Sequence, residues 1–205
     1  GDIVLGRAGA ISRDLGAAFV DVGERHAAIL MLGAAGTSGH PPCEGASLIL
    51  QALRPAIDGK GAKLTAAITL SGRFLKLAPV QPHVRPRPAP QGLPAAIAGL
   101  DPGIGEWTLR PAASAAGSEP LAAEARQLLA AWRQVQEDAK TARAPAILWR
   151  AADPVLALCA EAACGSETRI VCDDPQTAAR LRLQAPDLAG RIDGVRPAGS
   201  AFARF

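Results

Sequence analysis

Histidine, cysteine and aromatic residues are scarce in this sequence of 205 residues. It has 3 His, 4 Cys, 3 Trp, 4 Phe and no Tyr. The histidines are scattered, and no two cysteines form a C-x-x-C pair. This spacing predicts no zinc site, and we expect reduced thiols in a cytosolic protein. With so few histidines, neither a Ser-His-Asp nor a Cys-His nucleophile can be placed.

Long apolar runs are missing as well. The sequence contains neither the stretch of about 18 apolar residues that a membrane span needs nor a signal-peptide pattern. We therefore expect no membrane span and a cytoplasmic location. The chain starts inside a strand-like run, GDIVLGR, and stops at FARF, which is typical of a piece of a longer protein. Its net charge of +3 permits an anionic partner without requiring one.

What the sequence does contain is the composition of a globular protein. Hydrophobic residues make up 49% and charged residues 20%. The first 78 or so residues carry short strand patterns separated by turn-rich segments, which predicts a small all-β barrel. The expected strands are Ile3–Arg7, Ala17–Val22, Ala27–Met31, Leu48–Ala52, and Lys63–Leu64 leading into AITLSGRFLKLAP.

A change of texture follows at residues 79 to about 104. The stretch PVQPHVRPRPAPQGLP is dense in proline and carries Arg85 and Arg87. It cannot form a regular helix or a central strand. We expect a linker or an extended wrap there.

Beyond that segment the pattern alternates between strands and helices. EWTLRPA (106–112) predicts a strand, and Ser118 is the expected N-cap of a helix from Glu119 to about Lys140. Further strands are expected at 145–150 and 168–172, with Asp-Pro pairs at 153–154 and 174–175 opening helices. This order indicates an α/β unit. The long helix has one apolar stripe, made by Leu121, Ala125, Leu128, Trp132, Val135 and Ala139.

Phe19 has an unusual place in its predicted strand. Alternation puts Val20 and Val22 on the core face, so Phe19 faces outward on the side that also carries Asp21. A Phe on the open face of a small barrel, with lysines nearby, is typical of a base-stacking platform for single-stranded nucleic acid. The alternative is that a neighbouring loop or domain covers this ring.

Two further groups are candidate sites. DGKGAK (58–63) lacks the spacing of a nucleotide-binding phosphate loop, but Lys60 and Lys63 could donate to phosphates from a hairpin. Asp173 and Asp174 follow a predicted strand, where adjacent carboxylates can hold a divalent metal. Because Asp174 precedes Pro175, helix capping explains the same pattern and is the favoured interpretation.

The same residues carry a family resemblance. GDIVLGRAGAISRDLGAAFVDVGERHAAIL, followed after a loop by DGKGAKLTAAITLSGRFLKLAP, resembles the S1 domain of the ribonuclease E/G family. The family pattern runs G-[ND]-I-Y-L-G-[KR]-V, A-A-F-V-D-[IY]-G, [TN]-K-G-A-x-L-T and L-x-G-R-[FY]-L-V-L-x-P. The resemblance continues more weakly through GEWTLRPAA, EARQLLAAWRQV, PAILWRAADPVLALCAEA, TRIVCDDPQTAARL and SAFARF.

This resemblance implies a mixed α and β architecture in three parts. Residues 1–78 would be an S1 domain of the OB type, 79–152 a 5′-sensor region with the proline-rich linker, and 153–205 part of an RNase H-like α/β subdomain. Family members are magnesium-dependent endoribonucleases, hydrolases that cut single-stranded RNA in ribosomal and transfer RNA maturation and in messenger decay. Their catalytic segment lies beyond the end of this chain, so we expect no metal site here and no cleavage by this chain alone.

The resemblance also assigns roles to individual residues. Phe19 matches the aromatic that stacks RNA, Lys60 the lysine that contacts it, and Arg110 the arginine that contacts a 5′-monophosphate. The full set of expected RNA contacts is Phe19, Lys60, Lys63, Arg25 and His26. The chain departs from the family at Ile29, where a second aromatic is usual, and at Pro111, where a threonine is usual.

The predicted function is therefore RNA binding within a ribonuclease E/G-type endoribonuclease. An alternative is an inactive S1-containing RNA-binding or scaffold protein, which the coding sequence beyond Phe205 would distinguish. A third option, an α/β enzyme with an accessory barrel, would need a polar pocket between residues 106 and 174. The oligomeric state of the full-length protein, including a homo-oligomer, stays open at this point.

Overall fold

The computed structural model describes residues 1–33, 42–57, 59–80, 97, 100, 103–151, 155, 158–159 and 168–194. The chain divides into two compact units, Gly1–Ala151 and Ala152–Phe205, each of which is described by itself. The proline-rich stretch with Arg85 and Arg87 and the expected cap at 153–154 lie outside the described residues.

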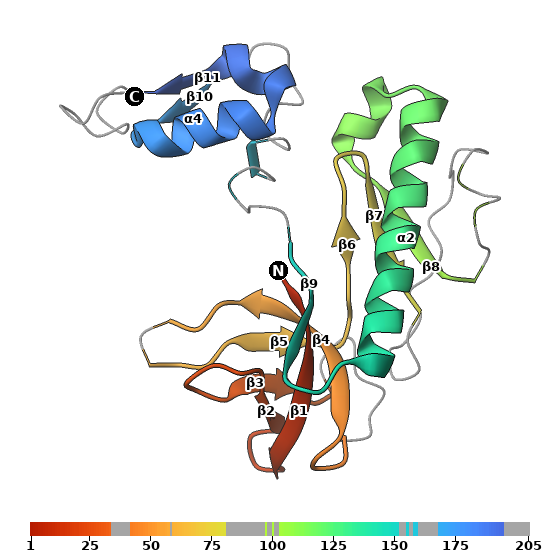
Figure 1. Ribbon diagram of the computed structural model, residues 1–205, viewed down its shortest axis with the longest axis vertical. Coiled ribbons are helices and arrows are strands. Elements are labelled where there is room, and N and C mark those ends of the chain that lie inside the picture. Colours follow the sequence, from red (N-terminus) through yellow and green to blue (C-terminus); the bar gives the residue numbers. More distant parts are fainter. Residues whose placement is uncertain are drawn as a thin grey trace. The chain divides into compact units, whose positions relative to one another are not determined.

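The first unit begins with a closed five-stranded barrel (Figure 1). Its strands are β1 (Ile3–Ser12), β2 (Ala17–Asp21), β3 (Ala28–Met31), β4 (Ser47–Arg54) and β5 (Lys63–Thr65). They pair in the cyclic order β1–β2–β3–β5–β4–β1, with β3 and β5 parallel and the other pairs antiparallel. This arrangement confirms the predicted OB-type barrel within a mixed α and β fold.

The barrel core follows from the alternation along the strands. Every second residue of β2 and β3 is buried, and these side chains meet others from β1, β4 and β5. Small residues dominate on β2 and β3, which suits the narrow interior of a five-stranded barrel. The buried core consists of Val4, Ala18, Val20, Ala28, Leu30, Leu50, Ala62 and Leu64.

A second sheet in this unit has three antiparallel strands: β6 (Leu70–Ser71), β7 (Leu75–Pro79) and β8 (Gly105–Leu109). The sequence predicts barrel strands up to about residue 78, yet in the structure β7 pairs with β6 and β8. The reason is the buried face of β7, whose Leu75 and Leu77 pack in a core shared with Trp107 rather than inside the barrel. The barrel gains an outer strand instead, because β9 (Ala146–Trp149) pairs with β1.

The long helix α2 (Ser118–Thr141) packs against this second sheet (Figure 1). Its predicted stripe is buried from Leu121 to Val135, whereas Ala139 is half-buried. The expected N-cap was wrong: Ser118 is the first helical residue and the N-cap is Gly117, with no side-chain cap hydrogen bond. A short 3-10 helix, η1 (Pro111–Ala115), precedes α2.

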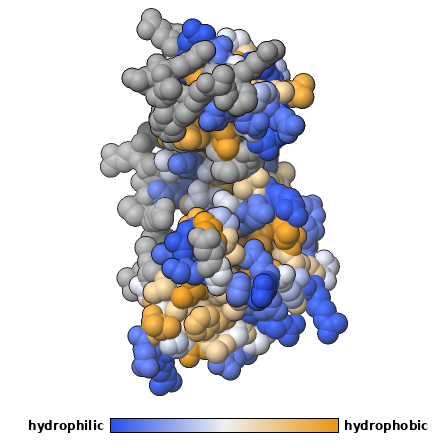
Figure 2. Space-filling view, turned by 90° about the vertical axis from the view of Figure 1, so that its left-hand side faces the viewer, coloured by the Kyte–Doolittle hydropathy of each residue, from blue (hydrophilic) through white to orange (hydrophobic). Residues whose placement is uncertain are grey.

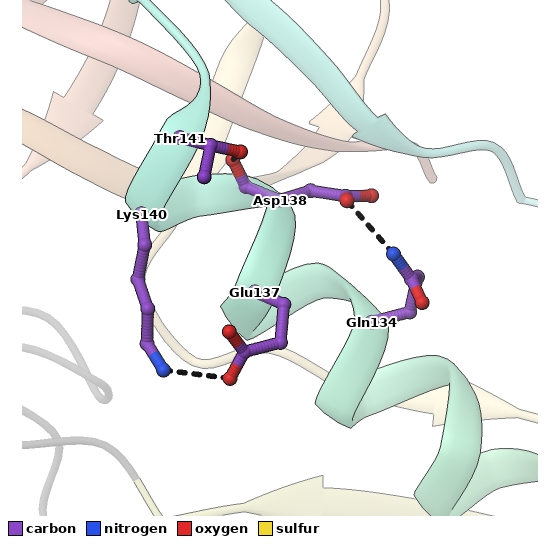
Figure 3. A network of polar contacts seen from close by, with 5 residues as sticks. All are labelled: Gln134, Glu137, Asp138, Lys140 and Thr141. Carbon is purple, nitrogen blue, oxygen red and sulfur yellow. Dashed lines mark hydrogen bonds and ion pairs between the residues drawn. The ribbon is translucent and has the colours of Figure 1, made fainter.

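The exposed face of α2 is polar at its C-terminal end (Figure 3). The Gln134 side-chain amide donates to Asp138 Oδ1 at 2.8 Å, and Lys140 Nζ lies 2.6 Å from Glu137 Oε1. The Thr141 hydroxyl donates to the Asp138 carbonyl oxygen. Such exposed contacts contribute little stability, so the buried stripe holds this helix in place.

The second unit contains two parallel strands, β10 (Ile170–Cys172) and β11 (Ile192–Gly194). Between them run α4 (Pro175–Gln184) and a 3-10 helix, η2 (Pro186–Arg191). Its small core consists of Cys159, Ala178, Leu181, Ala185, Leu188 and Ile192. The expected cap of α4 is confirmed, because the Asp174 carboxylate accepts the amide protons of Gln176 and Thr177.

Candidate nucleic-acid interface

Strand register aligns two predicted RNA contacts, Phe19 and Lys63, with Ile29 and Arg54 across the barrel. Phe19 on β2 is the Cα partner of Ile29 on β3, and Ile29 is in turn the partner of Lys63 on β5. Directly paired residues project from the same face of a sheet. Lys63 lies opposite Arg54 at a bulge in β4. We call Phe19, Ile29, Lys63 and Arg54 the cross-strand row.

The cross-strand row lies on the outside of the barrel. The neighbours of Phe19 in β2, Ala18 and Val20, are fully buried, whereas Phe19 is half-buried. Ile29 is also half-buried, and both Lys63 and Arg54 are exposed. One apolar end with an aromatic ring therefore continues into a cationic end.

The turns at one end of the row bring the other expected contacts together. Arg25 and His26 are exposed in the loop between β2 and β3. Lys60 is exposed in a hairpin turn, where it pairs with Ile57. The chain just after Lys60 runs against this loop, because a Cβ built on Gly61 would lie 1.9 Å from the Ala27 carbonyl oxygen. Only glycine permits that approach.

Asp21, the acid beside Phe19, has a structural role in this loop. Its Oδ1 accepts the Gly23 amide proton at 2.9 Å, the hydrogen bond of an Asx turn. Asp21 is also the Cα partner of Arg7 on β1. The carboxylate therefore turns the chain into the loop that carries Arg25 and His26.

Surface composition on one side of the barrel is mixed. Figure 2, where the barrel is at the bottom, shows orange and tan apolar residues interleaved with blue hydrophilic ones.

Arg110 belongs to the three-stranded sheet and not to the barrel row. It follows β8, its amide donates to the Phe74 carbonyl oxygen at 2.8 Å, and its guanidinium donates to the Gly72 carbonyl oxygen. The side chain is half-buried. Pro111, which follows it, begins η1 and supplies neither a hydroxyl nor an amide proton.

Asp174 caps helix α4, as the favoured interpretation of the Asp173–Asp174 pair predicts. The hydrogen bonds of Thr177 and Gln176 to the Asp174 carboxylate lower its pKa from the usual 3.8, as a helix cap does. Among the described residues, no three His, Cys, Asp or Glu side chains lie close enough together to hold a metal ion. None of the described helices combines the length and the apolar sequence that crossing a bilayer requires.

Two residues of interest carry no signal in the sequence. Arg54 joins the row only through the pairing of β4 with β5, and no sequence pattern announced that register. Glu124 on α2 accepts the amide protons of Arg73, Phe74 and Leu75. Its position beside the helix stripe gave no signal of this contact across about fifty residues.

Comparison with known proteins agrees with the sequence resemblance. The sequence model of the ribonuclease E/G family matches residues 69–196. Ribonuclease G of Escherichia coli strain K12 is 28% identical over 165 residues, which covers 68% of this chain and 33% of that protein. Ribonuclease G of Shigella flexneri gives the same values. The chain thus spans about a third of the length of these curated relatives.

Proposed function

Because the chain belongs to the ribonuclease E/G family, we propose that it is the RNA-binding N-terminal portion of an endoribonuclease that acts on single-stranded RNA in RNA processing and decay. The barrel holds the RNA. The cutting chemistry belongs to the part of the relatives that this chain does not span.

The cross-strand row is the observation that supports this proposal most directly. In this proposal a base stacks on Phe19 and packs beside Ile29. The RNA backbone then continues past Lys63 and Arg54, which lie in the same cross-strand row. Aromatic rings and cations in a row are how OB-type barrels hold single strands without strict sequence preference. Arg25, His26 and Lys60 add donors for phosphates from the two neighbouring turns.

Arg110 is the proposed contact for a 5′-terminal monophosphate. Its guanidinium is oriented by the Gly72 carbonyl, and a planar guanidinium suits phosphate oxygens. Pro111 removes the hydroxyl and the amide proton that a threonine would offer. We therefore expect the preference for a 5′-monophosphate to rest on Arg110 and to be modest.

Magnesium belongs to the family chemistry, in which the ion activates water and stabilises developing charge. The described residues of this chain do not fit such an ion, since they bring no three candidate ligands together. No step of hydrolysis is assigned to them. The proposal is binding by this chain and catalysis by the parent protein.

Substitution of Phe19 tests the binding face. Phe19→Ala should weaken binding of a fluorescent single-stranded RNA by about 1–3 kcal/mol, the value of one stacked base. Fluorescence anisotropy measures the affinity. Leu183→Ala is the matched control, because it truncates an exposed apolar side chain of the second unit. If folded Phe19→Ala binds as tightly as the unchanged chain, the row is not the RNA site.

Incubation with RNA and Mg²⁺ tests the division between binding and cleavage. The chain should bind single-stranded RNA and leave it intact, as judged by denaturing gel electrophoresis. Internal cleavage of the RNA that requires Mg²⁺ and copurifies with the chain would refute the assignment of catalysis to the part of the relatives that the chain does not span. The binding proposal would be unaffected, because the Phe19 variant tests it separately.

A further inference from the structure

A carboxylate from helix α2 occupies the turn between β6 and β7. Glu124 Oε1 accepts the Arg73 amide proton, and Oε2 accepts those of Phe74 and Leu75 at 2.7 and 2.8 Å. Three consecutive backbone amides thus converge on one charged group. Hydrogen bonds with an ionised partner are stronger than neutral ones, so this carboxylate fixes the turn firmly.

The approach leaves no space for a side chain at position 72 unless the Glu124 carboxylate moves. A Cβ on Gly72 would lie 2.4 Å from the Glu124 carboxyl carbon. No side chain fits there while the carboxylate keeps its place. Glu124 therefore fits closely against the turn and accepts three of its amide protons.

The opposite side of the same turn holds Arg110. The Gly72 carbonyl accepts from the Arg110 guanidinium, and the Phe74 carbonyl accepts from the Arg110 amide. The Gly72 amide also donates to the Leu75 carbonyl oxygen at 2.9 Å, which closes the hairpin. The turn thus binds Glu124 through its amides and Arg110 through its carbonyls.

We propose that Glu124 is a positioning residue for Arg110: its carboxylate sets the turn, and the turn sets the guanidinium toward a 5′-terminal phosphate of RNA. This inference rests on the proposed role of Arg110. The coupling runs through four residues of backbone, so removal of the Glu124 charge changes the orientation of Arg110 without removing any atom of Arg110 itself.

A simpler role would be to tie α2 to the sheet for stability alone. The two roles differ in what they do to RNA. A purely structural tie would affect the affinity for all RNA ends alike, whereas a positioning role affects the 5′-phosphate specifically. The ratio of affinities for 5′-monophosphorylated and 5′-hydroxyl RNA of one sequence separates them.

The test compares Glu124→Gln, Arg110→Ala and the control Glu119→Gln. Gln keeps the size of Glu124 but loses its charge, and Glu119 is an exposed acid of the same helix, paired with Arg126. We expect Glu124→Gln to lower the 5′-phosphate preference as Arg110→Ala does, with unchanged affinity for 5′-hydroxyl RNA. The preference should fall by at least about tenfold, as for the loss of one hydrogen bond to a charged group. Glu119→Gln should keep it.

A second readout needs no RNA. The NMR resonances of the Arg110 guanidinium should shift and broaden in Glu124→Gln and stay in place in Glu119→Gln. Unchanged Arg110 resonances, or an equal loss of affinity for both RNA ends, would overturn the positioning role. If the unchanged chain shows no 5′-phosphate preference while Glu124→Gln still moves Arg110, the 5′-phosphate role of both residues is refuted. RNA binding by the barrel is judged by Phe19→Ala regardless.

Discussion

Ile29 limits the proposed stacking surface around Phe19. It is the direct cross-strand partner of Phe19, and it is half-buried on the same face. A ring there would lie beside the Phe19 ring, since directly paired side chains of neighbouring strands are in contact distance. The cross-strand row therefore offers a single aromatic ring, that of Phe19.

Ile29→Phe should strengthen binding of single-stranded RNA. A second stacked base is worth about 1–3 kcal/mol, so we expect a gain toward the lower end of that range. Anisotropy titration measures it, with Ile29→Val as the control that keeps an aliphatic side chain. A folded Ile29→Phe that binds RNA no better than Ile29→Val would show that bases do not reach the second strand.

Much of this surface was predictable one residue at a time. Alternation alone put Phe19 outside and Val20 inside, because the side-chain period of a strand is two. Arg54 was not predictable, since its neighbour depends on the pairing of β4 with β5 and on a bulge. The contact of Glu124 with the turn at 72–75 was also out of reach, because it joins segments far apart in the sequence.

Among the elements, helix α4 shows how one side chain starts a helix. The Asp174 carboxylate accepts two amide protons of the first turn, at 3.2 Å from Gln176 and 2.9 Å from Thr177. These hydrogen bonds favour the ionised form and lower the pKa of Asp174 from the usual 3.8. The cap is therefore present at neutral pH and is lost as the pH falls through the lowered pKa in the folded state.

The Thr177 amide should report this titration. Its NMR chemical shift is expected to change with a midpoint below 3.8, the ordinary value for the Asp174 carboxyl. Asp174→Asn should abolish the titration while keeping the helix start, because Asn is also a good N-cap. Asp173→Asn, a change at the exposed neighbour, should leave the midpoint in place. A midpoint at or above 3.8 would contradict the cap.

Elements were easier to predict than their partners. The strand at β2, the stripe of α2 and the Asp-Pro start of α4 all follow local rules of periodicity and capping. The N-cap of α2 is Gly117, one residue earlier than expected, because Ser118 is itself the first residue of the helix. The partnership of β7 with β8 depends on Trp107, which lies beyond the proline-rich stretch and is not a local signal.

Tryptophan distinguishes the two compact units of the molecule, because only the first unit contains it. All three tryptophans, Trp107, Trp132 and Trp149, lie in Gly1–Ala151, and Trp107 and Trp132 are buried. The second unit contains α4 but no tryptophan. Tryptophan fluorescence therefore reports unfolding of the first unit alone, whereas far-UV circular dichroism reports helices of both.

Asp174→Ala should separate the two units in thermal unfolding. Loss of the cap destabilises α4 and its small core, because the amides of Gln176 and Thr177 lose their acceptor. The circular dichroism signal should gain an earlier transition, while the fluorescence midpoint stays that of the unchanged chain. Trp132→Ala removes a side chain that is only 2% exposed. It should instead lower the free energy of unfolding of the first unit by about 3–5 kcal/mol and lower the transition temperature of that unit. Equal shifts of both signals in Asp174→Ala would mean that the chain unfolds as one cooperative body. A unit with its own core is instead expected to lose stability independently of its neighbour.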